Sequence, residues 1–143
     1  MKTVFSGIQP TGKVHLGNFL GAINNWVEMS NSKNKNYFCV VDLHSLTTHP
    51  DPKKMEENIL STVKVLIAAG INLENSTIYV QSQVSEHSQL SWILSNFCQI
   101  GELQRMTQFK EKSSELGNHA GILTYPILMT SAISNYNRNH GID

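Results

Sequence analysis

The most informative stretch of this sequence is Gly7-Ile-Gln-Pro-Thr-Gly-Lys-Val-His-Leu-Gly-Asn18, a loop with three glycines and one proline. The apolar run before it, over residues 3–8, predicts a buried strand that ends at Gly7. After it, apolar residues recur at three- and four-residue spacing from Leu16 to Val27, which predicts an amphipathic helix. A glycine loop between a first strand and a first helix favours phosphate, because backbone N–H groups and the helix dipole attract an anion.

Further elements alternate along the chain. Continuous apolar runs predict buried strands at 37–41 and 77–80. Between them, Asp51-Pro52 is a typical helix start, with Asp as N-cap, and Gly70 is a typical helix end. The rest predicts, in order, a helical stripe from Leu90 to Phe97, a polar helix over Gly101–Glu111, a loop over Ser113–His119 and an apolar segment over Ile122–Met129 that Pro126 interrupts.

The alternation of strands and helices predicts an α/β fold, a Rossmann-like parallel sheet with flanking helices and right-handed crossovers. In such sheets ligands bind at the carboxyl ends of the strands. We expect those ends at Gly7, Asp42 and Gln81.

Size and composition bound the function classes. The 143 residues suit one domain, and 40% hydrophobic content favours a globular fold. The formal net charge of zero excludes a protein that binds nucleic acid by a strongly basic surface alone. Cys39 and Cys98 lie in apolar runs, so we expect buried reduced thiols, and no CxxC pair indicates a metal site. The N-terminus has no signal-peptide pattern and no apolar run is long enough to span a membrane, so we expect a cytoplasmic protein without membrane contact.

Three interpretations of the glycine loop compete. The dinucleotide fingerprint GxGxxG is absent, because the glycines fall at positions 7, 12, 17 and 21. The Walker A pattern fits from Gly7 to Lys13, but Val14 stands where a hydroxyl must bind Mg²⁺. The third interpretation rests on His15-Leu-Gly-Asn18, which resembles the His-Ile-Gly-His signature of class I aminoacyl-tRNA synthetases, with Asn in place of the last His.

Several longer blocks resemble bacterial and mitochondrial tryptophanyl-tRNA synthetases, in order and at the family's spacing. They cover residues 1 to about 129. The blocks are Val4–Gly12, His15–Ala22, Val41–Thr47, Gly101–Lys112 and Gly121–Pro126.

The resemblance implies activation of tryptophan with ATP and Mg²⁺, transfer of the tryptophanyl group to tRNA(Trp), and a homodimer. His15 and Asn18 would hydrogen-bond the triphosphate as charge develops during adenylate formation. The resemblance places Gln9, Thr11, Gly17 and Asn18 around ATP, and Phe5, Gly7, His44, Tyr125 and Met129 around tryptophan. It gives no protein metal ligand.

Ordinary structural roles remain open for several of these residues. Phe5 and Met129 are also common core residues, and His44 after a strand end could cap backbone groups. Asp42 could orient His44 or cap a turn. The basic residues Arg105 and Lys110 to Lys112 would usually form a solvated face, although the family has its dimer interface and tRNA-facing side near this block.

Two departures from the family pattern stand out. The sequence contains no Lys-Met-Ser-Lys-Ser run, the second signature of the class, and no helical anticodon-reading segment. Residues 130–143 depart from the family, and Ala132 stands where the family has an aspartate that bonds the indole N–H. We therefore expect residues 1–143 to be a partial class I catalytic domain, truncated before the lysine loop, with incomplete activity. The alternative is a non-catalytic truncated paralogue that binds a nucleotide or a partner.

Overall fold

The computed structural model describes residues 2–12, 17 and 19–136. The chain falls into two compact units. Unit 1 comprises Met1–Ser45 and Pro50–Gln83, and unit 2 comprises Leu46–His49 and Val84–Asp143. The assignment of the whole chain to one partial catalytic domain stays a prediction.

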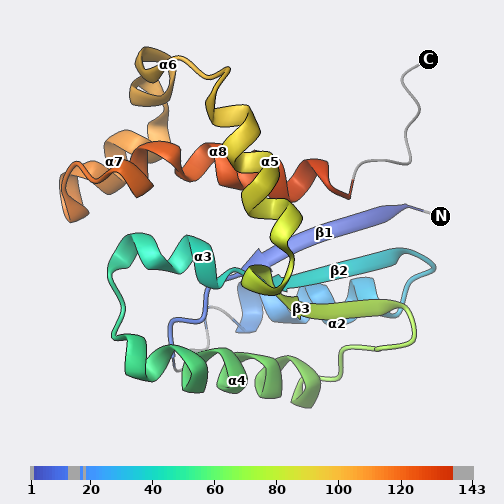
Figure 1. The fold of residues 1–143 in the computed structure, drawn as a ribbon. Coiled ribbons are helices and arrows are strands. Elements are labelled where there is room, and N and C mark those ends of the chain that lie inside the picture. The colour runs from blue at the N-terminus through green and yellow to red at the C-terminus, as the bar shows by residue number, and fades with distance from the viewer. Residues whose placement is uncertain (1, 13–16, 18, 137–143) are drawn as a thin grey trace, which may run out of the picture. The chain divides into compact units, whose positions relative to one another are not determined.

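Unit 1 is built on a parallel sheet of three strands. The strands are β1 (Thr3–Ile8), β2 (Lys35–Val40) and β3 (Ser76–Val80), with β2 in the middle, as Figure 1 shows. Gly7 lies opposite Cys39, and Val40 lies opposite Val80. The predicted parallel α/β fold is therefore confirmed, and the three carboxyl ends share one edge of the sheet.

Helices of unit 1 follow the predicted order. The first is a π-helical turn η1 (Phe19–Ile23) that continues into α2 (Asn24–Ser30). Part of the predicted start of this helix lies outside the described residues. Helix α4 (Pro52–Ala68) begins as predicted, because the Asp51 side chain accepts a hydrogen bond of 3.0 Å from Lys53 N. It ends before Gly70, whose φ of 95° is left-handed backbone that favours glycine.

Two short elements at the edge of the sheet were not predicted. Helix α3 (Asp42–Ser45) follows β2, and the 3₁₀ turn η3 (Gln81–Gln83) follows β3. Each is too short to show a helical period in the sequence.

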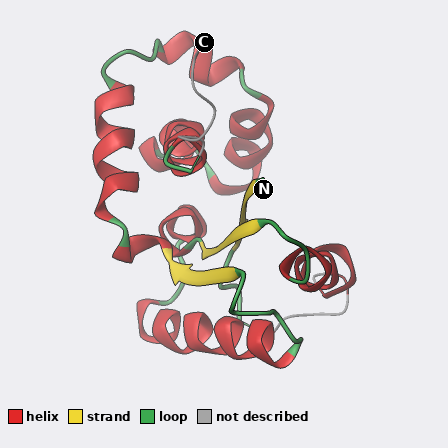
Figure 2. Cartoon of the chain, turned by 90° about the vertical axis from the view of Figure 1, so that its right-hand side faces the viewer, coloured by secondary structure: helices red, strands yellow, loops and turns green. Residues whose placement is uncertain are grey.

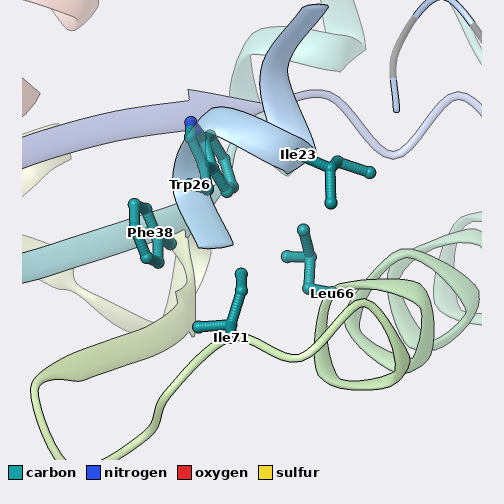
Figure 3. Close-up of a cluster of buried hydrophobic side chains, with 5 residues drawn as sticks. All are labelled: Ile23, Trp26, Phe38, Leu66 and Ile71. Atoms are coloured by element: carbon teal, nitrogen blue, oxygen red, sulfur yellow. The ribbon is translucent and has the colours of Figure 1, made fainter. Parts of the chain in front are cut away.

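The core of unit 1 lies between the sheet and helices α2 and α4. Figure 3 shows its five buried side chains, which are Ile23, Trp26, Phe38, Leu66 and Ile71. The rings of Trp26 and Phe38 are stacked, with centroids 4.6 Å apart and planes 8° from parallel. Because Trp26 comes from α2, Phe38 from β2 and Leu66 from α4, both helices cover the face of the sheet that carries Phe38.

Buried polar groups tie the loops of unit 1 to this core. The Asn36 side-chain amide donates to the carbonyl oxygens of Met29, Asn34 and Asn75, each at 3.2 Å. Asn36 is fully buried, so these bonds replace the water that its amide would otherwise bind. They join the end of α2, the start of β2 and the turn before β3.

Unit 2 is helical, and its helices α5 to α8 are labelled in Figure 1 and belong to the red ribbons of Figure 2. Helix α5 (Ser85–Ser95) packs against α8 (Ala120–Ser134), and α6 (Ile100–Arg105) and α7 (Thr107–Leu116) also contact α8. The 3₁₀ turn η2 (Leu46–Thr48) contacts the same helix. The most buried apolar residues of unit 2 are Leu103, Ile122, Ile127 and Ala132.

Several predictions for unit 2 are wrong. The single polar helix predicted over Gly101–Glu111 is divided at Met106, whose extended backbone ends α6 and precedes α7. The predicted loop over Ser113–His119 is helical as far as Leu116, because the polar run continues the turns of α7. Pro126 does not interrupt its segment, since α8 runs through it. A proline inside a helix removes one hydrogen bond, and burial of Pro126 and Ile127 offsets that loss.

The cysteines differ in their surroundings. Both are free thiols, Cys39 is buried in β2, and Cys98 is exposed. The expected burial of Cys98 is wrong, because the turn after α5 places it at the surface. Among the described residues, no helix is long and apolar enough to cross a membrane.

Candidate functional site at the edge of the sheet

The carboxyl edge of the sheet brings together side chains from two strand ends. His44 Nδ1 lies 2.9 Å from Gln81 Oε1 in a buried hydrogen bond. His44 lies in α3, immediately after β2, and Gln81 is the first residue after β3. The two residues are far apart in sequence and meet because β2 and β3 are parallel neighbours.

The Asp42 side chain stabilises this edge by hydrogen bonds with backbone N–H groups. Its Oδ1 accepts hydrogen bonds from Leu43 N and from Ser82 N, both at 3.0 Å. The Ser45 hydroxyl donates to the Asp42 carbonyl oxygen at 2.6 Å. The bonds of the Asp42 side chain to backbone N–H groups are those of a cap, and His44 Nδ1 donates to Gln81 Oε1.

Gly7 and Phe5 occupy β1 as predicted. A Cβ atom on Gly7 would lie 2.8 Å from Val41 Cγ1, so any other residue would force Val41 to move. Phe5 is partly buried and lies opposite Tyr37 in the register. Their predicted contact with tryptophan stays a prediction.

The residues expected around ATP lie in the loop after β1. The Gln9 carbonyl oxygen accepts a hydrogen bond from Thr11 N at 3.0 Å, which forms a tight turn. Gln9 is partly buried, and Thr11 and Gly17 are exposed. The two expected catalytic residues, His15 and Asn18, lie outside the described residues.

Tyr125 and Met129 lie in unit 2, four residues apart on α8, which puts them on one face of that helix. Both are partly buried, and burial raises the pKa of Tyr125 above its usual value of 10.0. A tyrosine hydroxyl with its usual pKa already keeps its proton at neutral pH, and burial of Tyr125 favours the protonated form further. Lys112 Nζ lies 5.0 Å from the centre of the Tyr125 ring, so this lysine packs on an aromatic face.

The structure thus divides the expected tryptophan contacts between the two units, with Phe5, Gly7 and His44 in unit 1 and Tyr125 and Met129 in unit 2. It also adds Gln81, which sequence reasoning placed at a strand end without giving it a role. Its position after the third strand was the one signal available. Among the described residues, no three His, Cys, Asp or Glu side chains gather as metal ligands would.

Comparison with known proteins defines the class. The family model described as tRNA synthetases class I (W and Y) matches residues 1–142. The chain belongs to this family, as the His15–Asn18 signature, the longer blocks and the parallel sheet indicate.

Within the family, three relatives of the tryptophan type are similar to this chain over nearly its whole length. The chain is 50% identical over 141 residues to a tryptophan–tRNA ligase of Prochlorococcus marinus. The matched stretch covers 97% of this chain and 41% of that relative. The tryptophanyl-tRNA synthetase structure from Mycoplasma pneumoniae matches with a TM-score of 0.84 and 36% identity, over 93% of this chain and 40% of that one. The Campylobacter jejuni synthetase, whose structure is a complex with ADP and tryptophan, matches with a TM-score of 0.84 and 33% identity, over 92% of this chain and 41% of that one. The chain therefore spans about 40% of the length of these relatives.

Proposed function

We propose that this chain forms the ATP- and tryptophan-binding part of a tryptophan–tRNA ligase. The observation that carries the proposal is the 50% identity to a ligase of that name over 97% of the chain. The bonded His44–Gln81 pair at the carboxyl edge of the sheet supports it, because ligands of α/β sheets bind at that edge.

The proposed reaction has two steps. A carboxylate oxygen of tryptophan attacks the α-phosphorus of ATP, the bond to the β-phosphate breaks, and pyrophosphate leaves. A ribose hydroxyl of tRNA(Trp) then attacks the carbonyl carbon of the adenylate, and AMP leaves. Both steps need positioning and charge neutralisation rather than a covalent enzyme intermediate.

Each group of residues has a role in this proposal. Gln9, Thr11, His15, Gly17 and Asn18 hold ATP, and His15 and Asn18 stabilise the charge that develops on the phosphates. Mg²⁺ neutralises the triphosphate and takes oxygen ligands from it.

The proposed tryptophan contacts are Phe5, Gly7 and His44 of unit 1, and Tyr125 and Met129 of unit 2. Apolar walls with a few placed polar groups suit an indole ring. The Tyr125 hydroxyl, which remains protonated at neutral pH, can donate to the substrate.

A homodimer is part of the same proposal. Trp92 and Phe97 are 74% and 81% exposed, and Ile93 and Ile100 beside them in sequence are also exposed. A cluster of large exposed apolar side chains is typical of a protein–protein interface. We propose that a second copy covers this surface. We also propose that the exposed basic residues Arg105 and Lys110 contact tRNA phosphates. The proposed location is the cytoplasm, where ATP and tRNA are both present.

A chimeric enzyme tests the proposal. The matching 41% of the Prochlorococcus marinus ligase is replaced by this chain, and pyrophosphate exchange into ATP is measured with tryptophan and with tyrosine. We expect exchange that depends on tryptophan and falls about 100-fold in the chimera with His15→Ala. We expect the 143-residue chain alone to exchange far more slowly than the relative. A folded chimera without tryptophan-dependent exchange would contradict the proposal.

A further inference from the structure

Gln81 is the feature at the sheet edge to which neither the sequence nor the family comparison gives a role. It is a fully buried polar side chain directly after β3. Its Oε1 accepts from His44 Nδ1 at 2.9 Å, while its Nε2 is buried with no hydrogen-bond partner among the described residues. A buried amide is costly unless it is bonded, so the side-chain bond to His44 is the clearest reason for Gln81 to lie there.

The backbone around this pair is held on both sides. Asp42 Oδ1 binds Ser82 N, the residue after Gln81, and Leu43 N, the residue before His44. One carboxylate oxygen therefore joins the segment that carries the imidazole to the segment that carries the amide. The distance between the two side chains is set by the fold rather than by flexible loops.

The hydrogen bond determines the protonation of the ring. An amide oxygen can only accept, so a ring nitrogen that bonds to it must carry the proton. In the neutral ring, His44 is then protonated at Nδ1, and Nε2 carries the lone pair. If the amide were turned by 180°, its NH₂ would face Nδ1, and the ring would have to be protonated at Nε2 instead.

We infer that Gln81 is a positioning residue, which holds His44 in the Nδ1-protonated form so that Nε2 can accept a hydrogen bond from an N–H group of the amino-acid substrate. The inference rests on the proposed function, which places His44 beside tryptophan. Both the ammonium group and the indole of tryptophan are N–H donors, so an acceptor nitrogen is the complementary group. Gln81 itself acts through His44.

The ring protonation can be measured without any ligand. Nitrogen-15 chemical shifts of the histidine rings are recorded on the 143-residue chain, and His44→Gln identifies the His44 signals. We expect the wild-type ring to be protonated at Nδ1. A ring protonated at Nε2 would overturn the inference whatever the variants do.

Two substitutions of Gln81 separate the acceptor from the shape of the side chain. Gln81→Met keeps the length and removes the acceptor, so we expect a mixture of the two ring forms. Gln81→Glu keeps an acceptor oxygen, so Nδ1 should stay protonated. Thr62→Val is the matched control, because Thr62 is equally buried in unit 1 and its hydroxyl bonds within α4 to the Asn58 carbonyl oxygen at 2.8 Å. It should lower stability without changing the His44 signals, and unchanged signals in Gln81→Met would contradict the inference.

Tryptophan affinity gives the functional readout. In Gln81→Met we expect about tenfold weaker binding, the loss of about one hydrogen bond, with affinity kept in Thr62→Val. Wild-type affinity in Gln81→Met despite a mixed ring would overturn the positioning role and leave the proposed function intact. A wild-type chain that binds no tryptophan would contradict the proposed function and the substrate role of Nε2. The nitrogen-15 signals of the His44 ring would still show whether Gln81 sets its protonation.

Discussion

The two units of the chain differ in where each places a tryptophan and a phenylalanine. In unit 1, Trp26 and Phe38 are stacked in a core that excludes solvent. In unit 2, Trp92 and Phe97 are mostly exposed, and a largely apolar cavity of about 270 Å³ lies beside Leu103 and Ile127. Unit 1 therefore buries its aromatic pair in its own core, whereas unit 2 leaves its pair on a surface that suits a second copy of the chain.

Truncation of one phenylalanine in each unit should give the largest difference in the free energy of unfolding. Phe38→Ala removes a fully buried ring and leaves a cavity, so we expect a loss of about 3–5 kcal/mol in the free energy of unfolding. Phe97→Ala makes the same chemical change at a side chain that is 81% exposed, so we expect a change below about 0.5 kcal/mol in the monomer. Urea titrations followed by circular dichroism measure both, and equal losses would show that the two units do not differ in this way.

A charge on the exposed surface of unit 2 tests the role proposed for it. Phe97→Glu should raise the dimer dissociation constant at least 30-fold, because a carboxylate at the centre of an apolar interface loses its water. Leu60→Glu on α4 is the matched control in unit 1, since Leu60 is 52% exposed. Sedimentation velocity measures both variants. A dimer that survives Phe97→Glu, or one that Leu60→Glu breaks instead, would place the interface elsewhere.

The two cysteines differ in an effect that appears only at high pH. Burial raises the pKa of Cys39 from 9.0 to about 12, so the folded chain keeps this proton where the unfolded chain releases it. As pH rises from 9.0 toward 12, the unfolded state binds fewer protons than the folded state and stability falls, by at most about 1.4 kcal/mol per pH unit from this group.

Comparison with variants isolates that effect. Cys39→Ala should lose this part of the decline in stability above pH 9, whereas Cys98→Ser should keep it, because Cys98 is exposed. A thiol reagent at pH 8 should label Cys98 rapidly and Cys39 only after unfolding. Rapid labelling of Cys39 in the folded chain would contradict its burial.

The sequence predicted unit 1 better than unit 2 for physical reasons. The strand around Phe38 is a continuous apolar run, and Asp51 with Pro52 is a strong local start signal, so both elements are encoded by neighbouring residues. In unit 2, Pro126 is a local helix breaker, yet α8 runs through it. The helix is stabilised by packing against residues distant in sequence, which the residues next to Pro126 do not reveal.

In the candidate site, too, contacts between residues distant in sequence could not be predicted. The family resemblance named His44, but its bond to Gln81 depends on the pairing of β2 with β3, which joins residues 37 positions apart. Sequence reasoning could place Gln81 at the end of a strand and could not say which side chain it meets there.

Calorimetric titration of the 143-residue chain measures whether it holds the tryptophan site proposed for it. Tryptophan, phenylalanine and ATP are titrated separately into the wild-type chain and into His44→Ala. We expect saturable binding of tryptophan, weak in comparison with a complete ligase, no measurable binding of phenylalanine, and loss of tryptophan binding in His44→Ala. Binding of ATP without binding of either amino acid, or equal binding of tryptophan and phenylalanine, would contradict the proposed site.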